Sequence, residues 1–127
     1  MSETLEEYLE GTEHSVGTKW MNDIFVDGKF KISGVLCTSE NNGGKFQLNA
    51  GIGVNLNTKG VPETTTLSDL LGNKEIDVEE FVKKLLKNLT ARVRQLDAES
   101  FGEESSVRKA VLKRLAFMDD KVNIFDG

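Results

Sequence analysis

The sequence predicts an α/β fold of the α+β type, in which helices pack on one face of a largely antiparallel sheet. Three observations predict it. Up to Asn57, apolar residues tend to alternate with polar ones, and Asp27-Gly28 and Asn41-Asn42-Gly43-Gly44 mark tight turns. Beyond Asn57 the apolar period changes to about 3.6 residues, which is typical of helices. The chain has 127 residues, which is enough for one compact core and too few for two domains of ordinary size.

A short helix and two short strands are predicted before the first turn. Thr4 to Leu9 has the pattern of a helical turn, with Thr4 as its N-cap and Glu7 completing a capping box. Gly17 to Trp20 and Ile24 to Val26 have the pattern of strands. The helix is therefore expected to lead directly into the sheet.

The Asp27-Gly28 turn is expected to bring polar residues together. Asp and Gly tolerate positive φ, so the segment after the turn folds back along the segment before it. We therefore expect Asn22, Asp23 and Lys31 to lie close to one another.

A long antiparallel hairpin follows. Its predicted strands are Lys31 to Ser39 and Lys45 to Asn55, joined by the asparagine and glycine turn. Gly34 is expected where a side chain would obstruct something close by. Gly51 and Gly53 interrupt the second strand, which indicates that backbone or a ligand approaches there.

The second half of the chain is predicted to be helical. A short helix begins at Thr66-Leu67-Ser68-Asp69 and ends at Gly72, and Asp77-Val78-Glu79-Glu80 is a capping-box start for a longer one. A third helix is expected around Val107 to Leu115, and a strand from Lys121 to Phe125. The longer helix is expected to pack on the sheet through an apolar stripe made of Val78, Phe81, Val82, Leu85, Leu89, Val93 and Leu96.

Composition excludes several classes of protein. The formal net charge is -5, and the residues from Met1 to Ser15 include five glutamates and no Lys or Arg. An acidic chain without a basic stripe lacks the counterion release that drives nucleic-acid binding, so we expect no nucleic-acid partner. No apolar run approaches the roughly 18 residues needed to cross a bilayer, and no secretory signal is present, so we expect a cytoplasmic protein without a membrane partner. The single cysteine, Cys37, fits a reducing compartment and argues against a structural zinc site.

Three short motifs stand out: KWMND at 19–23, KISGVL at 31–36 and GIGVN at 51–55. They resemble the ordered motifs of biotin protein ligases, also called holocarboxylase synthetases, which usually read KWPND, K-[IL]-x-G-[IV]-L and G-x-G-x-N. One such motif is weak evidence, but three in order at compatible spacing form a specific match. The resemblance runs from about Val16 to about Leu89, with weaker similarity to the end of the chain.

The resemblance also implies a fold and its limits. The catalytic domain of biotin and lipoate protein ligases has a mixed, largely antiparallel sheet with helices on one face. Residues 1–116 would be the C-terminal half of that domain, which makes the fold incomplete. Residues 117–127 would be the first strand of a truncated small C-terminal β domain.

The implied activity is that of a biotin-[carboxyl carrier protein] ligase. Biotin and ATP, with magnesium, give biotinyl-AMP, and the biotinyl group is then transferred to a lysine of a biotin carboxyl carrier domain of a carboxylase. On spacing alone, a lysine in a half-buried strand is usually a solvated surface cation. The resemblance instead makes Lys31 the catalytic cation, beside the biotin carboxylate and the phosphate of the adenylate.

The resemblance assigns further roles beside Lys31. Asp23 would orient Lys31 or help to hold magnesium, and Asn22 would lie on the nucleotide side; both residues could equally cap the turn. Lys19 would add positive potential and Trp20 an apolar wall, although both could be scaffold.

For the third motif, the resemblance implies that Gly51 and Gly53, like Gly34, admit the ligand, and that Asn55 contacts adenine. The alternative is a kinked strand that ends in a turn. His14 has no serine or cysteine constellation around it, and Cys37 continues an apolar strand, so neither is given a catalytic role.

Two departures from the family pattern bear on activity. Met21 stands where the first motif usually has proline, so a fixed φ that would help to hold Asn22 and Asp23 is missing. The glycine and arginine rich loop that closes over biotin and the adenylate in the family does not occur in this sequence. We therefore expect adenylate to leak from the isolated chain or to form inefficiently.

Several alternatives stay open at this point. The chain could be a non-catalytic truncated relative that binds ligand or partner, or a lipoate ligase or octanoyl transferase of the same fold. It could also be part of a longer protein. The sequence leaves both a monomer and a homodimer open.

Overall fold

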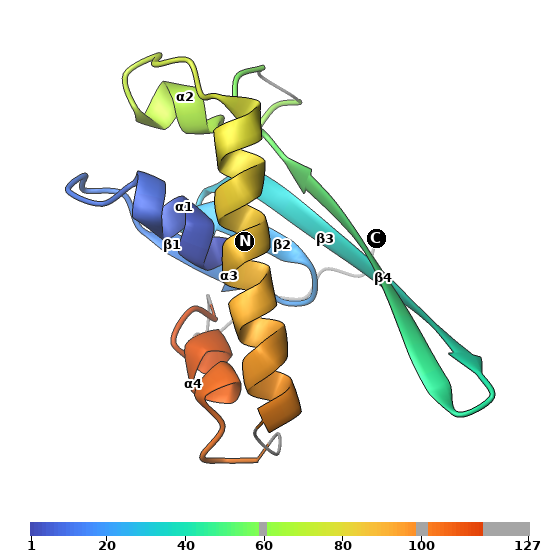
Figure 1. Ribbon diagram of the computed structural model, residues 1–127. Coiled ribbons are helices and arrows are strands. Elements are labelled where there is room, and N and C mark those ends of the chain that lie inside the picture. The colour runs from blue at the N-terminus through green and yellow to red at the C-terminus, as the bar shows by residue number, and fades with distance from the viewer. Residues whose placement is uncertain (59–60, 99–101, 116–127) are drawn as a thin grey trace, which may run out of the picture.

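A computed structural model describes residues 1–58, 61–98 and 102–115 (Figure 1). In this part of the chain a four-stranded antiparallel sheet has the order β1-β2-β3-β4. The helices lie on one side of it, which confirms the predicted fold class. The strands are β1 (Val16–Lys19), β2 (Asp23–Val26), β3 (Phe30–Asn42) and β4 (Lys45–Val54), and the helices are α1 (Ser2–Tyr8), α2 (Leu67–Leu70), α3 (Val78–Ala98) and α4 (Ser106–Leu112).

The turn between β2 and β3 is the predicted Asp-Gly turn. Asp27 and Gly28 have φ values of 54° and 63°, in the left-handed region that these residues tolerate. The Asp27 carboxylate accepts a hydrogen bond from the Ser15 amide at 2.8 Å, and this bond holds the pKa of that carboxyl below its usual value. His14 Nδ1 lies 2.8 Å from the other carboxylate oxygen. The turn is therefore fastened to the segment before β1.

The second predicted hairpin is also confirmed. β3 and β4 pair without interruption from Ser33↔Val54 to Asn42↔Lys45. Gly43 and Gly44 have φ values of 62° and 85° at the turn. The far half of this hairpin extends away from the helices (Figure 1).

The core lies between the helices and the middle of the sheet. Its buried side chains come from α1 and its C-cap residue, from β2, β3, α2 and the first turn of α3, and from the segments around α2. They are Leu5, Leu9, Ile24, Val26, Ile32, Leu56, Leu67, Ile76 and Phe81.

One predicted cap is wrong. α1 begins at Ser2 with Met1 at its N-cap position, so Thr4 lies inside the helix. Thr4 is fully buried, and its hydroxyl accepts a hydrogen bond from Asn88 Nδ2 at 3.0 Å. Thr4 therefore links α1 to α3 instead of starting α1.

The predicted starts of α2 and α3 are confirmed. The Thr66 hydroxyl accepts from the Asp69 amide at 3.0 Å, and the Asp77 carboxylate accepts from the Glu80 amide at 3.0 Å. The third predicted helix is α4, which ends earlier than expected, at Leu112. The expected strand from Lys121 to Phe125, and the domain assigned to 117–127, lie outside the described residues. No helix in the described part of the chain is long and apolar enough to span a bilayer.

The expectation that the whole apolar stripe of α3 packs on the sheet is wrong. Of its seven members, Phe81 is buried and Leu85 packs against the core, while the other five are exposed. α3 contacts α1 and α4, which reach only one side of its apolar surface. The residues of the stripe are helical, as predicted, but most of their side chains are exposed.

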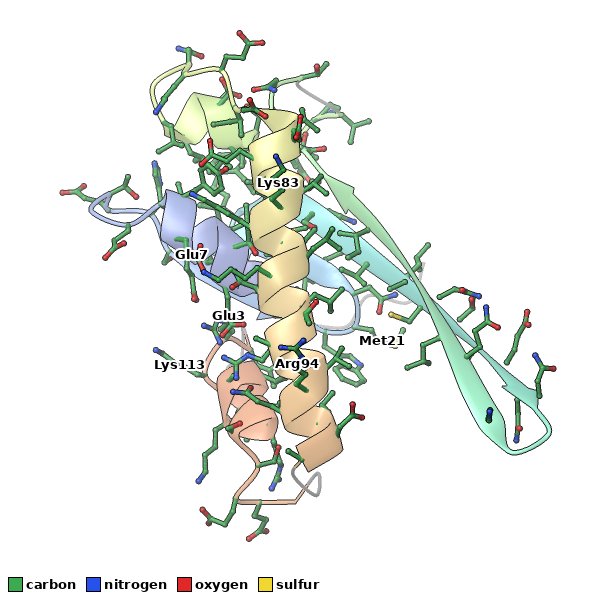
Figure 2. The ribbon with its side chains drawn as sticks, viewed as in Figure 1. Glu3, Glu7, Met21, Lys83, Arg94 and Lys113 are labelled. Carbon is green, nitrogen blue, oxygen red and sulfur yellow. The ribbon has the colours of Figure 1, made fainter. Side chains whose placement is uncertain are left out.

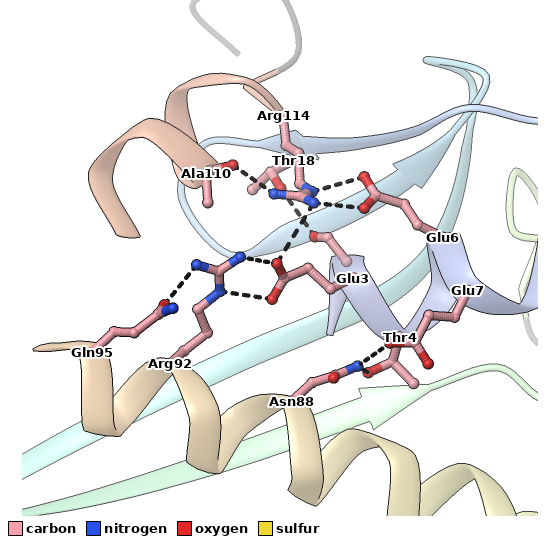
Figure 3. A network of polar contacts seen from close by, with 11 residues as sticks. Glu3, Thr4, Glu6, Glu7, Thr18, Asn88, Arg92, Gln95, Ala110 and Arg114 are labelled. Carbon is pink, nitrogen blue, oxygen red and sulfur yellow. Dashed lines mark hydrogen bonds and ion pairs between the residues drawn. The ribbon is translucent and has the colours of Figure 1, made fainter. Parts of the chain in front are cut away.

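An ion-pair network holds α1 against the other helices (Figure 3). Arg92 of α3 donates two hydrogen bonds to the Glu3 carboxylate, and Arg114 donates two to Glu6, at 2.7 and 2.6 Å. The bonds from Arg92 hold the pKa of the Glu3 carboxyl below its usual value of 4.5. The network therefore stabilises the fold while Glu3 is ionised.

We predict that Arg92→Ala lowers the free energy of unfolding at neutral pH by about 1.5–3 kcal/mol, because it removes two charge-assisted hydrogen bonds. A folded-state pKa below the unfolded one gives stability that is present above about pH 4.5 and lost as the pH falls. Urea unfolding followed across this pH range should therefore show a smaller acid-dependent loss in the variant.

Arg94→Ala is the matched control, since Arg94 is an exposed arginine on the outer side of the same helix (Figure 2). Equal effects of the two substitutions would contradict a specific role of the Arg92–Glu3 pair.

Candidate functional site

An extra residue in β3 sets the direction of Lys31. Ile24 pairs with Ser33 and the next residue, Phe25, pairs with Lys31, so Ile32 has no partner of its own in β2. This is a β-bulge, and it changes which face of the sheet the following side chains point to. In a regular strand, residues 31 and 34 would point to opposite faces. The bulge places Lys31 and Gly34 on the same face, and Ile32 in the core.

The bulge is held by two later segments of the chain. The Lys31 amide donates to the Glu63 carbonyl at 3.2 Å, and the Thr65 amide donates to the Lys31 carbonyl at 3.0 Å. The Ile32 carbonyl accepts from the Asn55 amide at 2.9 Å. The backbone of the bulge is therefore paired, and the second and third sequence motifs meet there.

Lys31 and Asp23 form an ion pair on this face. The Lys31 ammonium lies 2.6 Å from Asp23 Oδ1, and the two side chains are 41% and 35% exposed. Asp23 is directly opposite Gly34 in the register, which explains why the carboxylate and the ammonium meet above that glycine. The predicted proximity of Asp23 and Lys31 is confirmed.

Glycines leave the sheet bare beside the ion pair. Gly34 is opposite Gly53, and Leu36 is opposite Gly51. A Cβ at Gly51 would lie 3.7 Å from the Leu36 carbonyl and one at Gly53 would lie 4.0 Å from the Gly34 carbonyl, which are ordinary contacts. Packing within the described chain therefore does not require glycine at 51 or 53, whereas a ligand lying on the backbone would.

An open cavity of about 820 Å³ lies over this face. Seven of the nine predicted site residues line it. They are Asn22, Asp23, Lys31, Gly34, Gly51, Gly53 and Asn55. Asn22 is held there because its carbonyl accepts from the Val35 amide at 2.8 Å. The size of the cavity suits a small organic ligand.

Lys19 and Trp20 do not line this cavity. Lys19 is opposite Asp23 in the register of β1 and β2, and its ammonium lies 5.3 Å from the centre of the Phe25 ring. It therefore adds positive charge to the same face without reaching the cavity. Trp20 is 79% exposed and Met21 is 68% exposed, so the expected apolar wall is not formed by Trp20 within the described chain.

Seven lining residues were not predicted from the sequence, and two of them, Val61 and Thr64, lie outside the three sequence motifs. Val61 and Thr64 belong to the loop that pairs with the backbone of Lys31. The Thr64 hydroxyl donates to the Val61 carbonyl at 2.6 Å, which fixes the loop locally. A Pro-Glu-Thr-Thr-Thr segment shows a turn but gives no sign of which strand the turn will join.

The geometry is suited to holding an anion next to a flat group. One lysine is fixed by a carboxylate at the edge of the cavity, and the glycine backbone beside it allows close approach. Among residues 1–58, 61–98 and 102–115, no three His, Cys, Asp or Glu side chains gather as a metal site. The charged and amide side chains that line the cavity are those of Asp23, Lys31, Asn22 and Asn55.

Comparisons in sequence connect this chain with one family. Residues 1–57 match the model of the Biotin/lipoate A/B protein ligase family. The chain is 43% identical over 56 residues to chloroplastic biotin–protein ligase 1 of Arabidopsis thaliana, covering 44% of this chain and 14% of the relative. It is 38% identical over 58 residues to biotin–protein ligase 2 of the same plant, covering 46% of this chain and 17% of the relative.

Comparisons in structure extend the similarity to nearly the whole chain. The apo biotin protein ligase of Aquifex aeolicus is 30% identical with a TM-score of 0.71, over 92% of this chain and 50% of that one. The same enzyme in complex with biotin and ATP is 30% identical with a TM-score of 0.69, over 92% of this chain and 47% of that one. This chain thus spans about half the length of the solved ligases that it matches.

We predict that Gly34→Ala weakens the binding of an anionic ligand in this cavity roughly tenfold, because the added methyl group fills space at the floor of the cavity. The new Cβ would lie 3.4 Å from Asp23 Oδ1 and 3.5 Å from the Lys31 ammonium, so the chain itself tolerates it. The thermal midpoint should stay equal or rise slightly, since alanine restricts the unfolded chain. Calorimetric titration and a thermal scan measure the two effects.

Gly102→Ala is the control, because a Cβ there would meet nothing within 4 Å. Unchanged ligand binding by Gly34→Ala would show that the ligand does not approach this glycine.

Proposed function

We infer that this chain, which is a member of the biotin protein ligase family and corresponds to part of its catalytic domain, carries the cavity in which biotin and ATP react. The observation that supports this most directly is the Lys31–Asp23 pair, held at 2.6 Å by the bulge beside three glycines.

The first step proposed is the activation of biotin. An oxygen of the biotin carboxylate attacks the α-phosphorus of ATP, the bond from that phosphorus to the β-phosphate bridge breaks, and pyrophosphate leaves. Biotinyl-AMP remains. Negative charge develops on the α-phosphate oxygens during this step, and a cation fixed beside them stabilises the transition state more than the ground state. Lys31 is that cation.

Asp23 acts through Lys31. Its carboxylate holds the ammonium at 2.6 Å, which restricts a side chain that otherwise has four rotatable bonds. A restrained ammonium needs little reorganisation when the phosphate charge develops. Asp23 is therefore a positioning residue in this proposal.

The other lining residues would place the nucleotide. Gly34, Gly51 and Gly53 present backbone without side chains, so the adenylate can lie against the sheet. Asn22 and Asn55 border the same cavity and offer amide groups, which suits hydrogen bonding to the nucleotide, with Asn55 toward adenine.

The second step proposed is transfer to a carrier. The neutral ε-amine of a lysine on a biotin carboxyl carrier domain attacks the carbonyl carbon of biotinyl-AMP. The bond from that carbon to the phosphate oxygen breaks and AMP leaves, while the amine loses a proton and becomes an amide.

Magnesium is not assigned to Asp23 in this proposal. Asp23 is engaged by Lys31, and an ammonium at 2.6 Å repels a divalent cation on the same carboxylate. No three acidic, histidine or cysteine side chains gather elsewhere in the described residues. Within residues 1–58, 61–98 and 102–115, the side chains therefore do not form a magnesium site of their own.

The open cavity limits what the isolated chain can achieve. The Lys31 and Asp23 side chains are 41% and 35% exposed, so water reaches the position of the mixed anhydride. Water hydrolyses such an anhydride unless it is covered. We therefore expect this chain alone to bind the adenylate and to label a carrier slowly.

We predict that a non-hydrolysable biotinyl-adenylate analogue binds the chain and that Lys31→Ala weakens this binding about 10–100-fold, since it removes a hydrogen bond to a charged group. Calorimetry measures the affinity, and ATP-dependent biotin labelling of a carrier domain measures turnover. Labelling should fall to background in the variant.

Lys29→Ala is the matched control, because Lys29 lies two residues away, is exposed, and has its ammonium over the Phe30 ring at 4.9 Å. Equal losses in both variants would indicate only a change in net charge. Analogue binding without any labelling would favour a ligand-binding protein over a ligase, and preference for a lipoyl-adenylate analogue would favour a lipoate ligase.

A further inference from the structure

Residues 61–64, which lead toward α2, form a turn whose sequence does not suit its backbone. Pro62 and Glu63 are the two central residues of this turn. Proline fixes φ at about −65° at the first position, and Glu63 has a φ of 66° at the second. This combination is that of a type II turn, in which the second position favours glycine or asparagine. A glutamate has a Cβ and adopts this φ at a cost, so contacts around the turn must hold it there.

A side chain closes this turn. The Thr64 hydroxyl donates to the Val61 carbonyl at 2.6 Å, from the last residue of the turn to the first. A hydroxyl has one proton to donate, and this bond uses it. Although Thr64 lines the ligand cavity, its hydroxyl therefore acts as a donor to the turn and not to a ligand.

The closed turn holds the backbone of Lys31. Thr64 lies beside Lys31 in a parallel bridge, so the two residues that flank Thr64 bond to that lysine. The Lys31 amide donates to the Glu63 carbonyl at 3.2 Å, and the Thr65 amide donates to the Lys31 carbonyl at 3.0 Å. These two bonds bracket the residue whose side chain the bulge directs into the cavity. A displacement of the turn would therefore displace the backbone from which the lysine side chain starts.

The two bonds to Lys31 are supported differently. After Thr65 the chain enters the core, where Leu67 is fully buried and its amide donates to the Asn55 carbonyl at 2.9 Å. Before Thr65, Val61 and Glu63 are exposed, so burial does not fix them. The Glu63 carbonyl therefore depends on the turn for its position, and the turn is closed by the Thr64 hydroxyl.

We propose that Thr64 is a positioning residue for Lys31. By closing the turn, its hydroxyl keeps the Glu63 carbonyl against the Lys31 amide, and the ammonium of that lysine then stays paired with Asp23 at the edge of the cavity. Asp23 restrains the end of the lysine side chain, and Thr64 restrains the backbone where it begins. The inference rests on the proposed function, because the direction of the ammonium matters to the reaction if Lys31 meets the phosphate of an adenylate.

The first test is the rate of hydrogen exchange at the Lys31 amide, measured by NMR in the ligand-free chain. Thr64→Val removes the hydroxyl and keeps the branched shape of the side chain. The Lys31 amide should exchange about three- to tenfold faster in this variant, because its acceptor is no longer held in place. Thr64→Ser keeps a hydroxyl and should restore the rate of the parent chain. Unchanged exchange in Thr64→Val, or equally fast exchange in Thr64→Ser, would overturn the proposal.

Thr38→Val is the matched control. It removes a threonine hydroxyl from an exposed position of β3 that does not line the ligand cavity. Exchange at the Lys31 amide should stay at the rate of the parent chain. The same acceleration in Thr38→Val would also overturn the proposal, since the effect would then not come from the turn.

The second test determines whether Thr64 acts through Lys31. The affinity for the biotinyl-adenylate analogue is measured in the parent chain, in Thr64→Val, in Lys31→Ala and in the double variant. Thr64→Val should weaken binding about three- to tenfold when Lys31 is present, and less than about twofold when it is alanine, because residues that act through one contact are not additive. An equal loss in both backgrounds would contradict the positioning role, since Thr64 would then contact the ligand itself or support the fold in general.

The two tests separate this inference from the proposed function. Exchange at Lys31 is measured without nucleotide, whereas the analogue reports on the ligand site. Faster exchange in Thr64→Val together with no analogue binding by the parent chain would uphold the link from Thr64 to the Lys31 backbone and contradict the assigned ligand site.

Discussion

The bulge at Ile32 is the constraint on which the candidate site depends. Because of the bulge, Lys31 and Gly34 lie on the same face of β3 although they are three positions apart. The bulge also places the Ile32 side chain in the core. The Asp23 carboxylate then meets the Lys31 ammonium above a glycine, where a larger residue would contact both. Three backbone hydrogen bonds hold the bulge in turn. The Thr65 and Asn55 amides donate to it, and it donates to the Glu63 carbonyl. Residues far apart in the sequence therefore together fix the direction of the Lys31 side chain.

The two faces of the sheet serve different purposes. On one face, glycines of β3 and β4 leave backbone exposed beside a fixed cation, which suits a ligand. On the other face, Ile52 borders a groove beside α3, and the apolar side of that helix is largely uncovered. The ion-pair network of Arg92 and Arg114 fixes α1 and thereby sets which side of α3 stays bare. The bare backbone of the candidate site and the uncovered side of α3 thus lie on opposite faces of one sheet.

Local signals predicted local structure well. The Asp-Gly and Asn-Asn-Gly-Gly turns, the Thr66 and Asp77 caps and the long hairpin follow from residues adjacent in sequence, and the structure contains all of them. The first strand of the hairpin runs three residues beyond the predicted Ser39, to Asn42. The bulge could not be predicted, because it depends on a loop some thirty residues downstream. The stripe of α3 predicted a helix, but periodicity does not reveal what covers an apolar face. Thr4 was misplaced for a similar reason, since its partner Asn88 is distant in sequence.

The most direct test of the account is where an adenylate binds. An isotope-labelled sample titrated with the non-hydrolysable biotinyl-adenylate analogue, and followed by amide chemical shifts, locates the ligand residue by residue. We predict the largest changes at Lys31, Gly34 and Gly53, with little change at Gly43 and Gly44 in the distant hairpin turn. Changes centred on another part of the chain, with Lys31 and Gly34 unaffected, would contradict the central claim that the bulge builds the ligand site.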